Sequence, residues 1–301
     1  ERLIEELRHL LPQLPPPVTR PPRRRVASSR RLYLGLTDWH VGKRTLDREL
    51  IASPGMSTEI LRRRVELLQD GLHDLLQDLA RRPQEIIVVL HGDMLDDPLA
   101  QTYPRQDRGQ DLQGYRQLVE AVNLLHGFLA FCAGLAPELH IRAIRGNHST
   151  DWDLVAAHWA AERLRGWEGV SVHVDERPMT SIVRGRHQFI ALHGDRLRGG
   201  RTTRELDILR AIMMLGQPGY RHYVTFGHLH HREALNALLK ESTGYEWYLL
   251  PSMVGGDEYS ETLFATSRPA QMALLVDDEL GVLAPWTIYV DTPEIQEGIS
   301  A

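Results

Sequence analysis

Five short segments of the sequence combine Asp, Asn and His residues that could bind metal ions. They are Asp38-Trp39-His40, His91-Gly92-Asp93 with Asp96 and Asp97 behind it, Gly146-Asn147-His148, His193-Gly194-Asp195 and Gly227-His228-Leu229-His230. Carboxylate and amide oxygens mixed with imidazole nitrogens suit borderline transition metals better than Mg or Ca. Each segment alone is a weak signal, because an Asp-x-His pattern arises by chance about once in a chain of this composition.

The positions of these segments make them a stronger signal together. Aliphatic and β-branched runs predict strands at 31–36, 85–90, 139–144, 188–192 and 222–226, and each run ends just before one of the segments. Sheets of α/β proteins gather ligand-binding residues at the carboxyl ends of their strands, so we expect all five segments to meet in one crevice. Other histidines are expected to be core or surface residues: His73, His91, His126, His158, His173, His187, His222 and His231.

Amphipathic helices are predicted between the strands, and this alternation is typical of an α/β fold. The segment 57–82 begins with the capping pair Ser57 and Thr58 and keeps its aliphatic residues on one face, which predicts a long surface helix. Further helices are predicted near 112–133 and 153–165. Beyond residue 240 the runs YEWYLL, QMALLV and WTIYV predict shorter strands joined by turns.

The first thirty residues differ in composition from the rest. Residues 1–11 have leucines at helical spacing, Pro12–Pro22 excludes a helix, and arginines continue from Arg20 to Arg31. Residues 1–31 carry eight Arg against three Glu, or +5, so the total of −5 leaves −10 for the remainder. We therefore expect an N-terminal helix and Pro/Arg-rich arm at 1–30, which is either a solvated linker or an arm for phosphates or another subunit, and one domain at 31–301.

Composition also limits the class of protein. The single Cys132 excludes an internal disulfide framework, and no apolar run is long enough to span a bilayer. No signal-peptide pattern is seen at the start, so the expected location is the cytoplasm.

The ordered set D-x-H, G-D-x-x-D, G-N-H, H and G-H-x-H, from residue 38 to residue 230, resembles the calcineurin-like metallophosphoesterase superfamily. The resemblance implies a two-layer mixed β-sandwich flanked by helices, with two divalent transition-metal ions at the strand ends. Manganese is the first expectation, and Fe, Zn or Ni are alternatives. The resemblance implies that one metal is held by Asp38, His40 and His230, the other by Asn147, His193 and His228, and that Asp93 bridges both.

The same resemblance implies catalytic roles for two further residues. A hydroxide between two metal ions is nucleophilic at neutral pH, and His148 resembles the general acid that protonates the leaving alkoxide. Asp96 would orient His148, or alternatively cap the next helix. The chain departs from the family pattern at Ser149, where an acidic residue is common, and the next acid is Asp151.

The substrate depends on other features. The loop GDMLDDPLAQTYPRQ resembles one in the exonuclease-like small subunit of archaeal family-D DNA polymerases and in related phage phosphoesterases. Tyr103 could stack on a base and Arg105 could hold a phosphate, although a turn with a surface Tyr fits as well. The loop 196–201, with Arg198, adds positive charge that is either for a polyanion or only solubilising. The turn 252–258 is expected to be a hairpin, or to reach the cleft.

The leading expectation is a metal-dependent phosphodiesterase acting on nucleic acid, in particular a 3′–5′ exonuclease on DNA in replication or repair. One alternative is a phosphatase of small phosphoesters or phosphoproteins, and another is a non-catalytic polymerase-type accessory subunit. A homo-oligomer or a polymerase or repair partner is left open.

Overall fold

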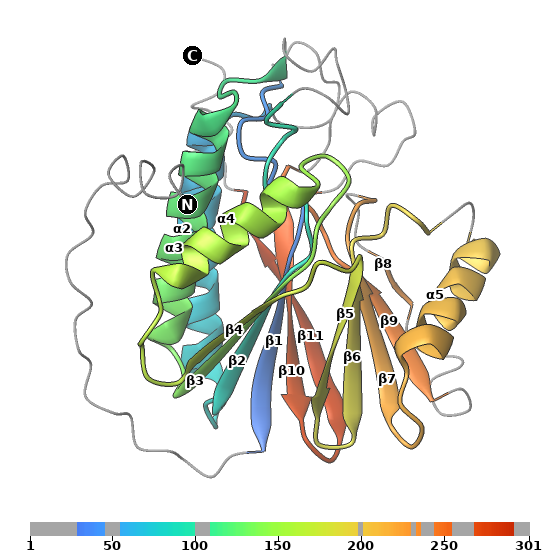
Figure 1. Ribbon diagram of the computed structural model, residues 1–301. Helices are drawn as coiled ribbons and strands as arrows, with labels where there is room; N and C mark the ends of the chain where they lie inside the picture. Colours follow the sequence, from blue (N-terminus) through green and yellow to red (C-terminus); the bar gives the residue numbers. More distant parts are fainter. Residues whose placement is uncertain are drawn as a thin grey trace.

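Two β-sheets packed face to face form the centre of the computed structural model, with helices on both outer sides (Figure 1). The structure describes residues 29–45, 55–99, 109–197, 201–229, 233–235, 244–254 and 268–291. The expected helix at 1–11 and the arm up to residue 28 lie outside these ranges, so the boundary between residues 30 and 31 stays a prediction.

The first sheet has six strands in the order β11-β10-β1-β2-β3-β4. Four of them run parallel: β1 (Arg30–Leu36), β2 (Glu85–Leu90), β3 (Glu138–Ala143) and β4 (Val170–Val174). β10 (Ala270–Asp277) pairs antiparallel with β1, and β11 (Gly281–Tyr289) pairs antiparallel with β10.

The second sheet has five strands in the order β5-β6-β7-β9-β8. β6 (His187–Leu192), β7 (Arg221–Phe226) and β9 (Tyr245–Leu249) run parallel. β5 (Met179–Arg184) and β8 (Glu233–Leu235) are the antiparallel edges. The two-layer mixed β-sandwich flanked by helices that the sequence resemblance implies is therefore confirmed.

The helices cover the outer faces of the two sheets. α2 (Thr58–Asp78), α3 (Tyr115–Ala133) and α4 (Asp151–Glu162) pack on the first sheet, and α5 (Arg201–Leu215) packs on the second (Figure 1). Alternation along β1 explains the layering: Leu32, Leu34 and Leu36 face the helices, whereas Tyr33 faces the second sheet. Successive strand residues point to opposite faces, so one strand serves two cores.

Most elements predicted from the sequence are present with small shifts of their ends. The predicted cap of α2 is confirmed, because the Ser57 side chain accepts a hydrogen bond from the Ile60 amide. Four elements were missed: β4, β5, α5 and β8. The three strands lie at sheet edges and are short, so their sequences lack long apolar runs. The helix α5 leaves Leu206 and Met213 exposed, so its sequence lacks a continuous apolar face.

The parallel strands bring the five chemical segments to one edge of the sandwich. His91 N donates to Leu36 O and Ile144 N to Leu90 O, so the chain leaves β1, β2 and β3 at the same level. Gly227 N donates to His193 O in the same way beyond β6 and β7.

Within the described ranges, no helix is long and apolar enough to cross a bilayer.

Candidate metal centre

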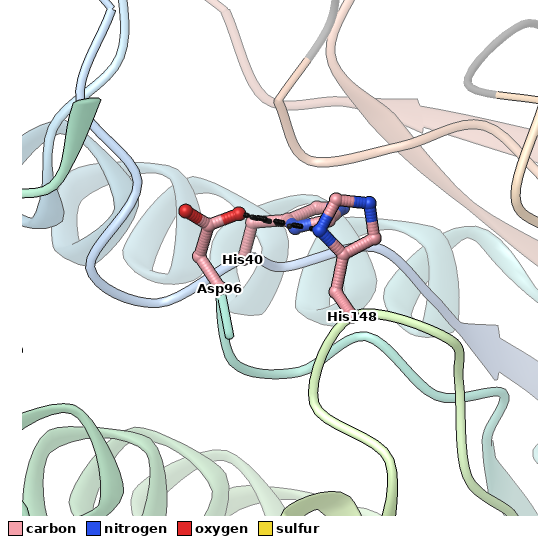
Figure 2. Close-up of side chains that lie close together, drawn as sticks. All are labelled: His40, Asp96 and His148. Atoms are coloured by element: carbon pink, nitrogen blue, oxygen red, sulfur yellow. Dashed lines mark hydrogen bonds and ion pairs between the residues drawn. The ribbon is translucent and has the colours of Figure 1, made fainter. Parts of the chain in front are cut away.

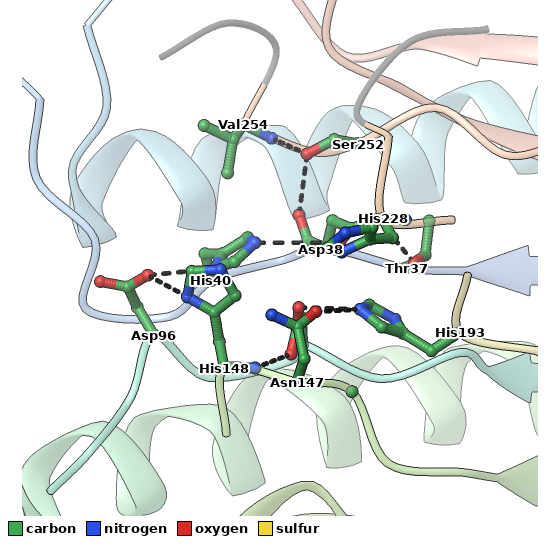
Figure 3. Close-up of polar contacts among 12 residues, drawn as sticks. Thr37, Asp38, His40, Asp96, Asn147, His148, His193, His228, Ser252 and Val254 are labelled. Carbon is green, nitrogen blue, oxygen red and sulfur yellow. Dashed lines mark hydrogen bonds and ion pairs between the residues drawn. The ribbon is translucent and has the colours of Figure 1, made fainter. Parts of the chain in front are cut away.

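Asp38 and His40 lie in the loop that follows β1, and both are completely buried. Both have left-handed backbone conformations, with φ of 53° and 48°, which cost energy for residues other than glycine. Asp38 Oδ2 accepts hydrogen bonds from Thr37 Oγ1 at 2.7 Å and from His228 N at 3.0 Å (Figure 3). Its Oδ1 lies 3.8 Å from His40 Nε2. The remaining oxygen of Asp38 and this imidazole nitrogen therefore face one position.

The C-terminal part of the chain holds this strained loop. The Gln271 amide, fully buried on β10, accepts from Thr37 N at 2.9 Å and donates to Thr37 O at 3.2 Å. Ser252 Oγ donates to Asp38 O at 3.1 Å and accepts from Val254 N at 2.9 Å (Figure 3). Ser252 thus contacts the loop of the metal centre, in line with the alternative to the hairpin that the sequence favoured, and 255–258 lie outside the described chain. Gln271 carried no signal in the sequence.

Asp93 follows β2 and is also completely buried, with a φ of 54°. Its Oδ1 accepts from His148 N at 2.8 Å, and its Oδ2 lies 3.0 Å from His193 Nε2. Burial raises the pKa of Asp93, but the charge and hydrogen bond of His193, together with the charges of His148 and His40, lower that pKa more, and the carboxylate stays ionised. Gly146 must be glycine here, because a Cβ would overlap the Asp93 carboxylate.

Asp153, on the first turn of α4, is a supporting residue that the sequence reasoning missed. Its Oδ2 accepts from Asp93 N at 2.9 Å and from Gly146 N at 2.8 Å, and its Oδ1 accepts from Met94 N at 2.8 Å. Burial, and then the charge of Asp93, raise the pKa of Asp153 to about 6. The next acid after Ser149 in sequence, Asp151, is instead exposed and pairs with Arg145. Asp153 lies on the buried face of α4, and the helical spacing of the buried residues of α4 is the sequence signal that could have identified it.

His193, Asn147 and His228 form the other side of the centre. His193 Nε2 lies 2.8 Å from Asn147 Oδ1, and its Nδ1 donates to His91 O at 2.9 Å. Burial lowers the pKa of His193, but the carboxylate of Asp93 outweighs burial and raises that pKa to about 10. The His228 ring lies 5.1 Å from that of His193, centroid to centroid. A proton on His193 would compensate the buried negative charge, and a metal ion would compete for the same nitrogen.

Asp96 lies to one side of the adjacent rings of His40 and His148, and its carboxylate faces both (Figure 2). Its Oδ1 is 3.0 Å from His40 Nδ1 and 3.7 Å from His148 Nδ1. Asp96 is thus closer to His40 than to His148, the residue that the resemblance implies it would orient. A carboxylate on Nδ1 fixes the His40 ring so that Nε2 faces Asp38. Burial and then His40 lower the pKa of His148 to about 3.

Among the described residues, three groups of buried or half-buried side chains have potential ligand atoms within 4.8 Å of one another. One joins Asp38, His40 and Asp93, and a second joins Asp93, His193 and His228; the third is the His40, Asp96 and His148 group of Figure 2. Ligand atoms bound to one ion at about 2.1 Å lie roughly 3.0–3.4 Å apart, and the distances of 2.8 to 3.8 Å around His193 and His40 bracket this value. The residues therefore fit metal ions, and Asp93 belongs to two groups.

Several predicted site residues lie outside the described part of the chain: His230, Tyr103, Arg105 and Arg198. Their roles stay predictions. Arg201, expected in the basic loop 196–201, is instead the first residue of α5, and residues 198–200 lie outside the described chain.

No protein-family model and no curated protein matches the chain. Among solved structures, it is similar to a single mutant of Vps29 from Entamoeba histolytica, at 16% identity and a TM-score of 0.38, over 85% of this chain and 98% of that one. Vps29 from Chaetomium thermophilum is similar at 12% identity and a TM-score of 0.35, over 82% of this chain and 84% of that one. A hypothetical protein from Thermus thermophilus is similar at 14% identity and a TM-score of 0.31, over 86% of this chain and 98% of that one. TM-scores of 0.31 to 0.38 carry no information about the function of this chain.

Proposed function

We propose that the protein is a metal-dependent phosphodiesterase that hydrolyses nucleic acid. The observation that carries the proposal is the position of Asp93, whose carboxylate is shared by a group with Asp38 and His40 and a group with His193 and His228. A carboxylate shared in this way supports a pair of cations rather than one. When bound, two such ions would activate water and offset the charge that builds on phosphoryl oxygens.

The protein's own contribution is to fix the ligands before a metal or substrate arrives. Asp96 binds His40 Nδ1, which turns His40 Nε2 toward Asp38. The His91 carbonyl binds His193 Nδ1, which turns His193 Nε2 toward Asp93 and Asn147. Ligands held by such outer contacts lose little freedom on binding.

His148 is the residue proposed to protonate the leaving oxygen. Its Nδ1 lies beside Asp96, the role proposed here assigns Nε2 to the substrate, and the side chain is 15% exposed at the edge of the site. With a pKa lowered to about 3 by burial and His40, the ring is neutral in the free protein. The negative charge of a bound phosphate ester raises the proton affinity of this ring, so the acid forms with the substrate in place.

The leaving group tests this role of His148. His148→Ala should slow cleavage of a dinucleotide, whose alkoxide leaving group needs a proton, by about 100-fold or more. The same variant should slow bis(p-nitrophenyl) phosphate much less, because nitrophenolate leaves without a proton. Equal losses on both substrates would remove His148 from this role.

Nucleic acid is proposed as substrate on the strength of Tyr103, Arg105 and Arg198 in the sequence. Arg31, at the end of the basic arm, does not contribute to the site. Its guanidinium binds Asp278 at 2.7 Å and Glu85 at 2.6 Å, at the opposite end of the strands.

The deciding experiment incubates the protein and Mn²⁺ with end-labelled single- and double-stranded DNA, RNA, and bis(p-nitrophenyl) phosphate. We expect metal-dependent shortening of at least one polymer, abolished in Asp93→Asn and unchanged in Asp74→Asn, an exposed control on α2. Hydrolysis of bis(p-nitrophenyl) phosphate without cleavage of any polymer would reject the nucleic-acid substrate and keep the phosphodiesterase. Hydrolysis of phosphomonoesters alone would favour a phosphatase, and no hydrolysis at all would favour an accessory subunit.

A further inference from the structure

His91 is a buried histidine next to the metal centre that belongs to none of the three metal-binding groups found among the described residues. It lies at the end of β2, directly before Gly92 and Asp93, and faces the second sheet. The sequence reasoning placed it among the core or surface residues. Its hydrogen bonds give it a more specific role.

Two reciprocal bonds connect His91 with the end of β6. His91 Nδ1 donates to Leu192 O at 3.1 Å, and His193 Nδ1 donates to His91 O at 2.9 Å. β2 and β6 belong to different sheets and have no backbone ladder between them. At this edge of the sandwich, the two bonds therefore fix how far Asp93 lies from His193.

The other nitrogen of His91 is fixed as well. Nε2 lies 3.2 Å from Tyr33 Oη and 3.4 Å from Thr225 Oγ1, and these two hydroxyls are 2.7 Å apart. Since Leu192 O can only accept, His91 Nδ1 donates to it, and Nε2 lies within hydrogen-bonding distance of both hydroxyls. Strands β1, β2, β6 and β7 thus meet at one imidazole.

We propose that His91 is a positioning residue that holds the two sheets at the spacing needed by a metal ion between them. The ligand group of Asp93, His193 and His228 spans the sheets, because Asp93 follows β2 whereas the two histidines follow β6 and β7. Among the described residues, the ligands of the other group, Asp38, His40 and Asp93, all follow strands of the first sheet. Loss of the His91 bonds should therefore weaken the cross-sheet site selectively. This inference depends on the metal centre and not on any particular substrate.

The test compares metal binding by four proteins: wild type, His91→Leu, His91→Asn and Phe189→Leu. His91→Leu removes both ring nitrogens, whereas the amide of His91→Asn can still donate near the position of Nδ1. Phe189→Leu is the control, since Phe189 stacks on Tyr33 in the same core layer and makes no bond to His91. Calorimetric titration with Mn²⁺ and with Zn²⁺ gives the number and affinity of the sites, and melting in EDTA gives the stability of each protein.

We expect wild type to bind two ions and His91→Leu to keep one site while the other weakens by about 10–100-fold, as for other residues that orient ligands. His91→Asn should recover most of this loss. Phe189→Leu should melt earlier yet bind two ions normally. The proposal would be overturned if His91→Leu bound two ions with the affinities of wild type. It would also be overturned if both sites weakened equally and His91→Asn did not restore the affinity. A wild type that binds no metal would overturn the metal centre itself, and that result is visible before any variant is compared.

Discussion

Two buried carboxylates lie at opposite ends of strand β2, and their partners differ in kind. Glu85, at the start, is 3% exposed and is bound by two guanidinium groups: Arg184 Nε at 2.7 Å and Arg31 Nη1 at 2.6 Å. Asp93, beyond the end, is 0% exposed and is faced by His193 Nε2 and the His148 amide. A carboxylate with permanent cations is neutralised by the protein, whereas one surrounded by imidazoles is compensated only by a removable proton.

This difference separates a structural charge from a site for a cation. Arginine keeps its proton under all ordinary conditions, so nothing can displace it from Glu85. The imidazole of His193 can exchange its proton for a metal ion, and Asp93 is then compensated by the metal. The backbone also differs between the two ends: Asp38, His40, Asp93 and His228 around the metal centre all have positive φ, whereas Glu85 and its arginine partners do not. Backbone strain of this kind gathers at functional sites.

The largest effect is expected for Asp93→Asn. Loss of the shared ligand should reduce metal-dependent hydrolysis by at least about 100-fold. It should also abolish the rise in melting temperature that Mn²⁺ gives wild type, because an ion that does not bind cannot stabilise the fold. Hydrolysis rates and melting curves with and without Mn²⁺ check both points. An Asp93→Asn protein that Mn²⁺ still stabilises fully would break the comparison.

The next effect concerns stability rather than metal. Glu85→Gln leaves Arg31 and Arg184 without their buried carboxylate and should cost about 2–4 kcal/mol of unfolding free energy. Chemical denaturation measures this loss, and the number of bound metal ions should stay as in wild type. If Glu85→Gln lost its metal while remaining folded, the two ends of β2 would not be independent.

Two glycine substitutions sharpen the contrast between site and scaffold. A Cβ on Gly227 would overlap Thr37 Oγ1 and lie 2.7 Å from Asp38 Oδ2, so Gly227→Ala should weaken metal binding by about 10–100-fold. Gly127, inside α3, has nothing within 4 Å of its Cβ position. Gly127→Ala should therefore stabilise the protein by about 0.5–1 kcal/mol and leave metal binding unchanged. Equal metal affinities in the two variants would contradict this account.

The smallest effect is the pH dependence of stability from Glu85. Burial raises the pKa of Glu85, but its bonds to Arg184 and Arg31 outweigh burial and hold that pKa below the ordinary 4.5. A lowered carboxyl pKa gives stability that is present above the unfolded pKa and is lost as the pH falls below about 4.5. Melting temperatures between pH 6 and pH 3, roughly the range where carboxylates titrate, should fall less steeply for Glu85→Gln than for wild type. Parallel curves would exclude Glu85 as the source.

The sequence predicted the inner strands and their ends because those strands are buried on both faces and read as apolar runs, as EIIVVL does. The sandwich itself was implied only by the resemblance of the Asp, Asn and His motifs to a known superfamily. The sequence also predicted which segments meet, since parallel strands deliver their ends to one edge. It did not predict the residues that hold the metal-site loops in place through hydrogen bonds. Gln271, Asp153 and His91 act through bonds that include partners 234, 60 and 101 positions away, and no local pattern marks Gln271 or the role of His91.

The central claim is that Asp93 is shared by a pair of metal ions. Its most direct test is the metal content of the protein after loading with Mn²⁺ and removal of free ions by gel filtration. The account predicts two ions per chain in wild type and in Glu85→Gln, and one or none in Asp93→Asn. Wild type without bound metal, or Asp93→Asn with two ions, would contradict it.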